Sequence, residues 1–123
     1  MSEKITVWAY LKEYEETKDE ILKAVTDVFE SGTLILGQKG KDFERAYSDY
    51  IGTKYGVGCD NGTNAIWLAL KALGIGAGDE VITVSNTAIP TVSAIVTAGA
   101  TPVFVDINPE TYLMDVTKLE AAI

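Results

Sequence analysis

The second half of the chain alternates between short extended segments and helical segments, and this alternation constrains the fold more than any other feature. Extended segments are expected at residues 55–59, 80–84 and 101–105, with helices at 63–73 and 90–98 between them. Short β-rich runs joined by helices of this length are typical of crossover connections in a parallel sheet. The sequence therefore predicts an α/β fold with a strand–helix–strand–helix–strand parallel core.

Two amphipathic helices are expected before this core, over residues 13–30 and 40–51. The stretch "SGTLILGQKG" between them holds an apolar segment bracketed by glycines, which is expected to pack on another surface rather than lie in water. The residues expected to face inward on the second helix are Phe43, Ala46, Tyr47 and Tyr50.

The helix at 63–73 is apolar nearly all round, which predicts that most of its sides are buried, by the sheet on one face and by a further layer or subunit on another. The glycine-rich stretch after it, "GIGAG", follows a helix and precedes a strand, the opposite of the context of a dinucleotide-binding loop. Gly74 is therefore expected to end the helix. Asp115 is a candidate N-cap for a further helix, and the abrupt end at Ile123 suggests a cut through a larger protein.

Composition excludes several classes of function. A net charge of -8 disfavours nucleic acid or an anionic membrane as a partner. The single cysteine, Cys59, and the absence of histidine exclude a disulfide framework, a Cys/His metal site and His-dependent nucleophilic catalysis. No apolar run approaches the ~20 residues that span a bilayer, and the polar start "MSEKIT" does not open a signal peptide. A cytoplasmic setting and no metal are expected.

Polar residues gather where two of the expected strands give way to helices. "DNGTN" at 60–64 follows the first strand, and Ser85, Asn86 and Thr87 follow the second, with Pro90 in the first helical turn after them. Open α/β sheets bind ligands at this edge, and the start of a helix suits an anion. Two capped helices that hold no ligand would account for the same residues. Both interpretations stay open from spacing alone.

The order of several motifs resembles one enzyme family. These are the "ESG…ILG" loop, the "FE" helix, "GT" at 62–63, "GIGAGDEVI", "AGATPVFVD" and "LEAAI". Together they resemble the amino-terminal part of the DegT/DnrJ/EryC1/StrS nucleotide-sugar aminotransferases, pyridoxal-phosphate (PLP) enzymes of the three-layer aspartate-aminotransferase fold. The resemblance implies amino-terminal helices and a dimer and active-site loop in residues 1–54. It implies the truncated first part of the large PLP-binding domain in residues 55–123.

The resemblance also implies a role for each of the two polar turns. In the family the Gly-Thr pair binds the cofactor phosphate, which implies that Gly62 and Thr63 do so here with Asn61 beside them. The second turn usually supplies an aromatic residue that stacks on the pyridine ring, and the matching residue here is Ala88. This departure leaves stacking in doubt or moves it to a neighbour such as Ile89 or Asn86.

Substrate-side contacts are implied as well. Asn86 is expected to contact substrate, and so is Leu34, because in the family the apolar loop lies near the active site at the dimer interface.

The implied reaction is amino transfer from glutamate to a keto-sugar carried on a nucleotide, in a homodimer with PLP as cofactor. The Schiff-base lysine lies beyond Ile123 in the family's order, so no catalytic residue is expected in this chain, and the chain alone is expected to be inactive. Two alternatives remain at this point: a non-catalytic PLP-binding regulator and a freestanding phosphate-binding α/β module.

Overall fold

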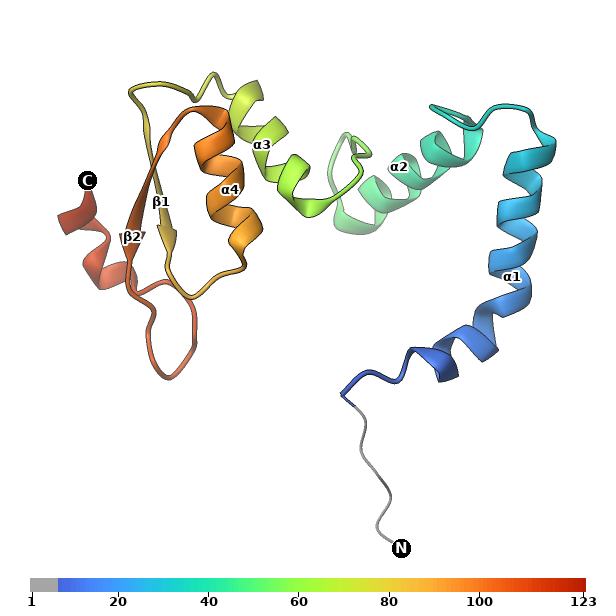
Figure 1. Cartoon of the computed structure of the whole chain (residues 1–123), viewed down its shortest axis with the longest axis horizontal. Coiled ribbons are helices and arrows are strands. Elements are labelled where there is room, and N and C mark those ends of the chain that lie inside the picture. Colours follow the sequence, from blue (N-terminus) through green and yellow to red (C-terminus); the bar gives the residue numbers. More distant parts are fainter. Residues whose placement is uncertain (1–6) are drawn as a thin grey trace, which may run out of the picture. The chain divides into compact units, whose positions relative to one another are not determined.

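A computed structural model describes residues 7–123 and divides the chain into two compact units. The first runs to Gly58, and the second is Cys59–Ile123 (Figure 1). Among the described helices, none combines the length and the apolar character needed to cross a membrane.

The first unit holds the two expected amphipathic helices, α1 (Tyr10–Glu30) and α2 (Gln38–Ile51). The α2 helix ends at Gly52, whose φ of 79° lies in the left-handed region and whose N–H donates to the carbonyl of Ser48 at 2.9 Å. Glycine suits this position because it carries no Cβ to clash. The expected helices are confirmed, and both begin two or three residues earlier than predicted.

The apolar faces of these helices are exposed, which corrects the prediction that α2 turns its aromatic residues inward. No residue of α1 is buried, and Phe29 is 68% exposed. On α2 the one buried residue is Ser48. The amphipathic pattern predicted the helices correctly, but a helix buries its apolar stripe only where another element covers it. The four residues expected to be inward and found exposed are Phe43, Ala46, Tyr47 and Tyr50.

Residues 55–59 form no strand among the described residues, so this element was predicted wrongly. Within this segment, Gly56 and Gly58 instead lie against α2. The N–H of Gly58 donates to the Glu44 carboxylate at 2.7 Å, and the Ser48 hydroxyl lies where a Cβ on Gly56 would stand. A β-rich composition specifies a strand only when a neighbouring strand accepts its backbone hydrogen bonds.

Replacing Gly56 with alanine is expected to destabilise this packing by about 1–3 kcal/mol. The new Cβ would lie 2.5 Å from the Ser48 hydroxyl oxygen and 2.8 Å from the Glu44 carbonyl oxygen, and the second of these atoms belongs to rigid helical backbone. Gly58→Ala is the matched control, because the atoms nearest its Cβ would belong to the flexible side chain of Glu44, the closest at 3.3 Å. Denaturant unfolding of the full-length protein measures both. Equal losses for the two variants would contradict the prediction.

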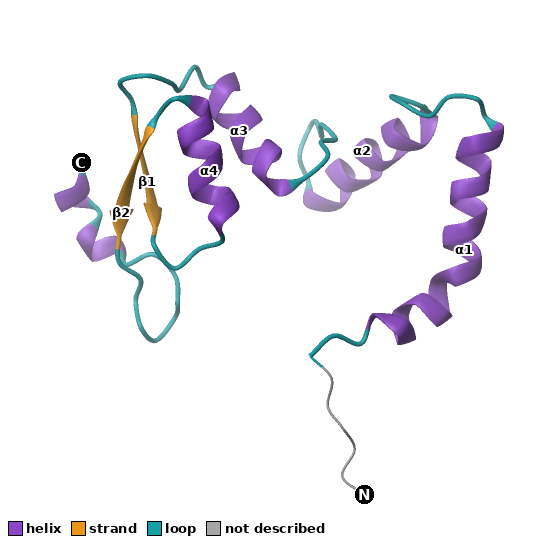
Figure 2. Ribbon diagram, viewed as in Figure 1, coloured by secondary structure: helices purple, strands orange, loops and turns teal. Residues whose placement is uncertain are grey.

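The second unit contains the predicted parallel sheet (Figure 2). Strands β1 (Glu80–Val84) and β2 (Thr101–Val105) pair in parallel from Glu80↔Thr101 to Val84↔Val105, and α4 (Ile89–Ala98) connects them. The β-branched residues of both strands suit a pleated surface. The carboxyl ends of β1 and β2 therefore lie at one edge of the sheet. The α/β class and both of these strands are confirmed.

The core of this unit lies where α3 (Gly62–Ala72) and α4 pack together. Its buried members are Leu70, Ile95, Ala98 and Ala100, and partly buried residues around them are Ile66, Trp67, Ile75 and Val81. Within the described residues α3 is not buried on most sides, and its burial by a further layer or subunit stays a prediction. Only Leu70 is buried on this helix, because α4 covers one side of it, while Leu68 is 44% exposed.

Gly74 ends α3 as expected, with a φ of 78°. Its N–H donates to the Lys71 carbonyl at 3.0 Å, and the N–H of Ile75 donates to the Leu70 carbonyl at 3.0 Å. This pair of bonds is the Schellman arrangement, in which the glycine adopts the left-handed conformation.

The last residues form two 3₁₀ turns, η1 (Val116–Lys118) and η2 (Glu120–Ala122), instead of the expected helix. The N–H of Lys118 donates to the Asp115 carbonyl at 3.0 Å and the N–H of Leu119 to the Val116 carbonyl at 3.3 Å, the three-residue spacing of a 3₁₀ turn.

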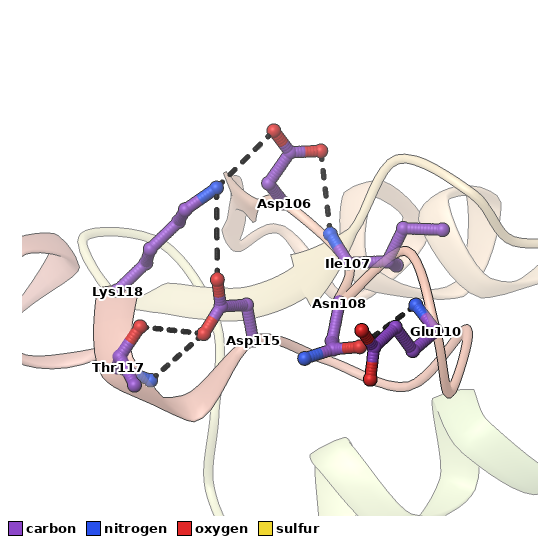
Figure 3. Close-up of polar contacts among 7 residues, drawn as sticks. All are labelled: Asp106, Ile107, Asn108, Glu110, Asp115, Thr117 and Lys118. Carbon is purple, nitrogen blue, oxygen red and sulfur yellow. Dashed lines mark hydrogen bonds and ion pairs between the residues drawn. The ribbon is translucent and has the colours of Figure 1, made fainter.

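Asp115 does cap the first of these turns, as predicted, through its carboxylate (Figure 3). The Thr117 hydroxyl donates to that carboxylate at 2.6 Å and holds the pKa of Asp115 below its usual value. Lys118 lies between this carboxylate and that of Asp106, at 3.7 and 3.5 Å (Figure 3). These contacts tie η1 to the carboxyl end of β2.

Candidate functional site

The turn before α3 is held by its N-cap residue, Asn61. The backbone of Asn61 is extended (φ -161°, ψ 168°), and its side-chain oxygen accepts the N–H of Asn64 at 2.9 Å. Its carbonyl accepts the N–H of Ala65 at 3.0 Å. An asparagine in this conformation satisfies one of the donors that a helix leaves unpaired at its start.

Three other donors at the start of α3 are free. Among the described residues, the N–H groups of Gly62 and Thr63 and the hydroxyl of Thr63 form no hydrogen bond with the chain. Apart from the two chain neighbours of Gly62 and the backbone of α3 itself, no heavy atom lies within 4 Å of the position that a Cβ on Gly62 would take, and Gly62 is exposed. Nothing in the chain's own packing therefore requires glycine here. Open space beside two free N–H groups at a helix start suits an oxyanion.

Asp60 fixes the amide groups around these donors, a role that the motif did not predict. Its two carboxylate oxygens accept the side-chain NH₂ groups of Asn61, at 3.0 Å, and Asn64, at 2.8 Å. Asn61 is thus committed to holding the turn, and its NH₂ group points to Asp60. The detectable signal was an acid one residue before an Asn cap, with a second Asn three residues after that cap.

The second polar turn precedes α4, whose N-cap is Ala88 (φ -71°, ψ 145°) with no side-chain cap bond. Pro90 stands in the first helical turn as expected. Asn86 is exposed, and Ile89 is 81% exposed. The amino ends of α3 and α4 lie at the same end of this unit as the carboxyl ends of the strands (Figure 1). The structure thus brings Asn61, Gly62 and Thr63 to the same end as Asn86 and Ala88.

Leu34 lies in the first unit, at a cavity of about 420 Å³ between the end of α1 and the start of α2. Leu36, which also lines this cavity, has a φ of 53°, an uncommon conformation for a non-glycine residue. Leu34 is 62% exposed, so the apolar loop is uncovered in this chain.

Comparison with known proteins identifies the chain's relatives. It is 57% identical over 117 residues to a dTDP-3-amino-3,4,6-trideoxy-alpha-D-glucose transaminase of Micromonospora megalomicea subsp. nigra, covering 95% of this chain and 31% of that protein. It is 45% identical over 112 residues to a protein of Geobacillus stearothermophilus named pleiotropic regulatory protein, covering 91% and 30%. The chain therefore spans about a third of the length of these relatives.

Solved structures agree with these relatives. The chain superposes on S. venezuelae DesV, solved in complex with a ketimine intermediate, with a TM-score of 0.94 at 36% identity, covering 99% of this chain and 33% of DesV. The family model described as the DegT/DnrJ/EryC1/StrS aminotransferase family matches residues 15–123. A match over this much of the chain, together with the shared fold, shows that the chain belongs to the DegT/DnrJ/EryC1/StrS aminotransferase family.

Proposed function

We propose that the full-length protein is a PLP-dependent aminotransferase that transfers an amino group from glutamate to a keto-sugar linked to a nucleotide. The family supports PLP as cofactor, and the names of the relatives support a sugar substrate. The observation within this chain that carries the proposal is the pair of unpaired N–H groups on Gly62 and Thr63 at the start of α3.

These residues fit the phosphate of PLP. The N–H groups of Gly62 and Thr63 and the Thr63 hydroxyl are the donors that would hold it, and charge-assisted hydrogen bonds of this kind are among the stronger ones in proteins. The partial positive charge at the start of α3 favours the dianion. When bound, PLP supplies an electron sink for the carbon that loses its proton. Asn61 keeps the turn in place from the chain's side, while Asp60 holds the amide of Asn61 away from the donors.

The other expected residues keep supporting roles in this proposal. Ala88 would lie beside the cofactor ring without the aromatic side chain that family members usually place there, and the exposed side chains of Ile89 and Asn86 are the neighbours able to cover it. Asn86 and Leu34 would contact the sugar substrate.

In this proposal the two parts of the chain have different roles. Residues 1–54 would contribute the dimer surface and active-site loop, and residues 55–123 the first part of the PLP domain. The exposed apolar faces of α1 and α2 suit burial in a homodimer. The lysine that bonds to PLP would lie outside these residues, so the 123-residue chain alone would be inactive.

The test uses the full-length protein with PLP, glutamate and a nucleotide-linked keto-sugar. Formation of 2-oxoglutarate with matching formation of the amino-sugar is the expected result, and aspartate and glutamine replace glutamate in parallel reactions to check the donor. A protein that binds PLP and produces no amino-sugar with any of these donors would contradict the proposal.

A regulatory role is the second candidate, and the name of the Geobacillus stearothermophilus relative favours it. A regulator on this fold would bind PLP through the same turn without turnover. PLP bound stoichiometrically, with no 2-oxoglutarate formed from glutamate, would select this candidate over the enzyme.

A further inference from the structure

The dipeptide Asn61-Gly62 combines three features that favour loss of the asparagine side-chain amide. Gly62 carries no Cβ, so nothing on that residue hinders approach of its nitrogen to the Asn61 side chain. The N–H of Gly62 forms no hydrogen bond among the described residues. Both residues are exposed in this chain, and apart from the chain neighbours of Gly62 and the backbone of α3 no heavy atom lies within 4 Å of the Cβ position of Gly62, so water can reach the dipeptide.

We propose that Asn61 is a deamidation site, at which the chain slowly converts its own N-cap into an acid. The Gly62 nitrogen gives up its proton to solvent and bonds to Cγ of Asn61, and the bond from Cγ to Nδ2 breaks. Nδ2 leaves as ammonia after taking up a proton. Water then opens the five-membered imide, giving aspartate or isoaspartate. One water is consumed and one ammonia released, with no change of oxidation state.

The hydrogen bonds of the cap restrain this reaction. Asn61 accepts from the N–H of Asn64 at 2.9 Å and donates to the Asp60 carboxylate at 3.0 Å, so its side chain must leave both partners before Cγ can meet the Gly62 nitrogen. The deamidation rate therefore follows how often the cap opens. Removing the Asp60 carboxylate is expected to speed the reaction.

The product changes the charge at the proposed phosphate site. Aspartate caps helices about as well as asparagine, so α3 keeps its start when the product is aspartate. The new carboxylate adds a second negative charge beside Asp60, which repels a phosphate. The isoaspartate product inserts an extra backbone carbon at the cap and disturbs α3. Both products reduce affinity for an anion at Gly62 and Thr63.

The chain contains its own controls, since its other asparagines differ in the residue that follows. Asn64 precedes Ala65, whose N–H is bonded to the Asn61 carbonyl at 3.0 Å, and Asn86 precedes a threonine. Asn108 precedes a proline, which has no N–H and cannot form the imide by this route.

The experiment incubates the full-length protein without PLP under native conditions and follows each asparagine by peptide mass mapping. Asn61 is expected to deamidate fastest, Asn64 and Asn86 several-fold more slowly, and Asn108 not at all. Asp60→Ala is expected to speed the reaction at Asn61, and Gly62→Ala to slow it. An Asn61 rate no higher than that of Asn64 or Asn86 would overturn the proposal. An unchanged rate in Asp60→Ala would overturn the restraint by the cap.

A second arm adds PLP, and this arm alone rests on the proposed function. With PLP at about 100 times its dissociation constant, the free fraction falls about 100-fold, and the rate at Asn61 is expected to fall by a similar factor. Fast deamidation that PLP does not slow would support the modification site and contradict phosphate binding at Gly62. Asn61→Asp, which carries the product's charge, is expected to bind PLP several-fold more weakly with α3 intact by circular dichroism.

Discussion

Replacing Gly62 with alanine is expected to weaken PLP binding by about 10- to 100-fold, the loss of one charge-assisted hydrogen bond worth about 1.5–3 kcal/mol. The added Cβ would stand beside the N–H groups that the phosphate approaches. Apart from the chain neighbours of Gly62 and the backbone of α3, no atom of the chain lies within 4 Å of that position, so the added methyl group displaces no packed side chain and a loss of affinity comes from what binds there. In the absence of PLP the same change is expected to stabilise α3, by up to about 1 kcal/mol, because alanine is the better helix former.

Gly62→Ala is thus expected to lower PLP affinity while it raises the stability of the PLP-free protein, and this combination separates loss of binding from loss of folding. Gly40→Ala is the matched control, because Gly40 also lies in a helix, with no atom beyond its chain neighbours and the backbone of α2 within 4 Å of its Cβ position. It is expected to raise stability similarly and to leave PLP affinity unchanged. Fluorescence titration with PLP and denaturant unfolding of the PLP-free protein give the two quantities. A Gly62→Ala protein that binds PLP as tightly as the unmodified one would refute phosphate binding at this turn.

The sequence predicts best where residues within a few positions of one another decide the structure. Gly74 was identified as the end of α3 from its place between a helix and a strand, and its positive φ and paired hydrogen bonds follow from local geometry. The parallel strands β1 and β2 were predicted with their observed bounds. Their apolar, β-branched runs and the connecting helix lie within one short stretch of chain.

Prediction from the sequence fails where residues far apart in the chain determine the local structure or the burial of a side chain. Residues 55–59 have a strand-like composition, yet Gly56 and Gly58 pack against Glu44 and Ser48 of α2 and the segment forms no strand. The aromatic residues of α2 were expected to be inward, yet no element of the described chain covers them. The amphipathic pattern shows which face of a helix is apolar, but it does not show which element packs against that face.

The candidate site likewise has one part that the sequence predicts and one part that it does not. The donors on Gly62 and Thr63 follow from a local motif, because the first N–H groups of any helix lack partners within that helix. The hydrogen bonds from the side chains of Asn61 and Asn64 to the Asp60 carboxylate depend on three side-chain orientations that the motif does not specify. The role of Asp60 therefore follows from the structure and not from the sequence motif.

Replacing Ile95 with alanine is expected to cost about 2–5 kcal/mol of unfolding free energy, the range for removing a large buried aliphatic side chain. Ile95 is 1% exposed and packs with Leu70 between α3 and α4. Its other buried neighbours, Ala98 and Ala100, are too small to fill the space it leaves. Val96→Ala, at an adjacent residue that is 58% exposed, is the control and is expected to change stability by no more than about 0.5 kcal/mol.

Both variants are measured by denaturant unfolding of the full-length protein, and equal losses of unfolding free energy would contradict the placement of Ile95 in this core. The core and the site are linked, because the α3–α4 packing that Ile95 supports positions the amino ends of both helices. PLP at about 100 times its dissociation constant is expected to return about 2.7 kcal/mol to the Ile95→Ala protein. At that same PLP concentration, the double variant with Gly62→Ala is expected to gain far less. Equal recovery in the two proteins would mean that PLP stabilises the fold from somewhere other than the start of α3.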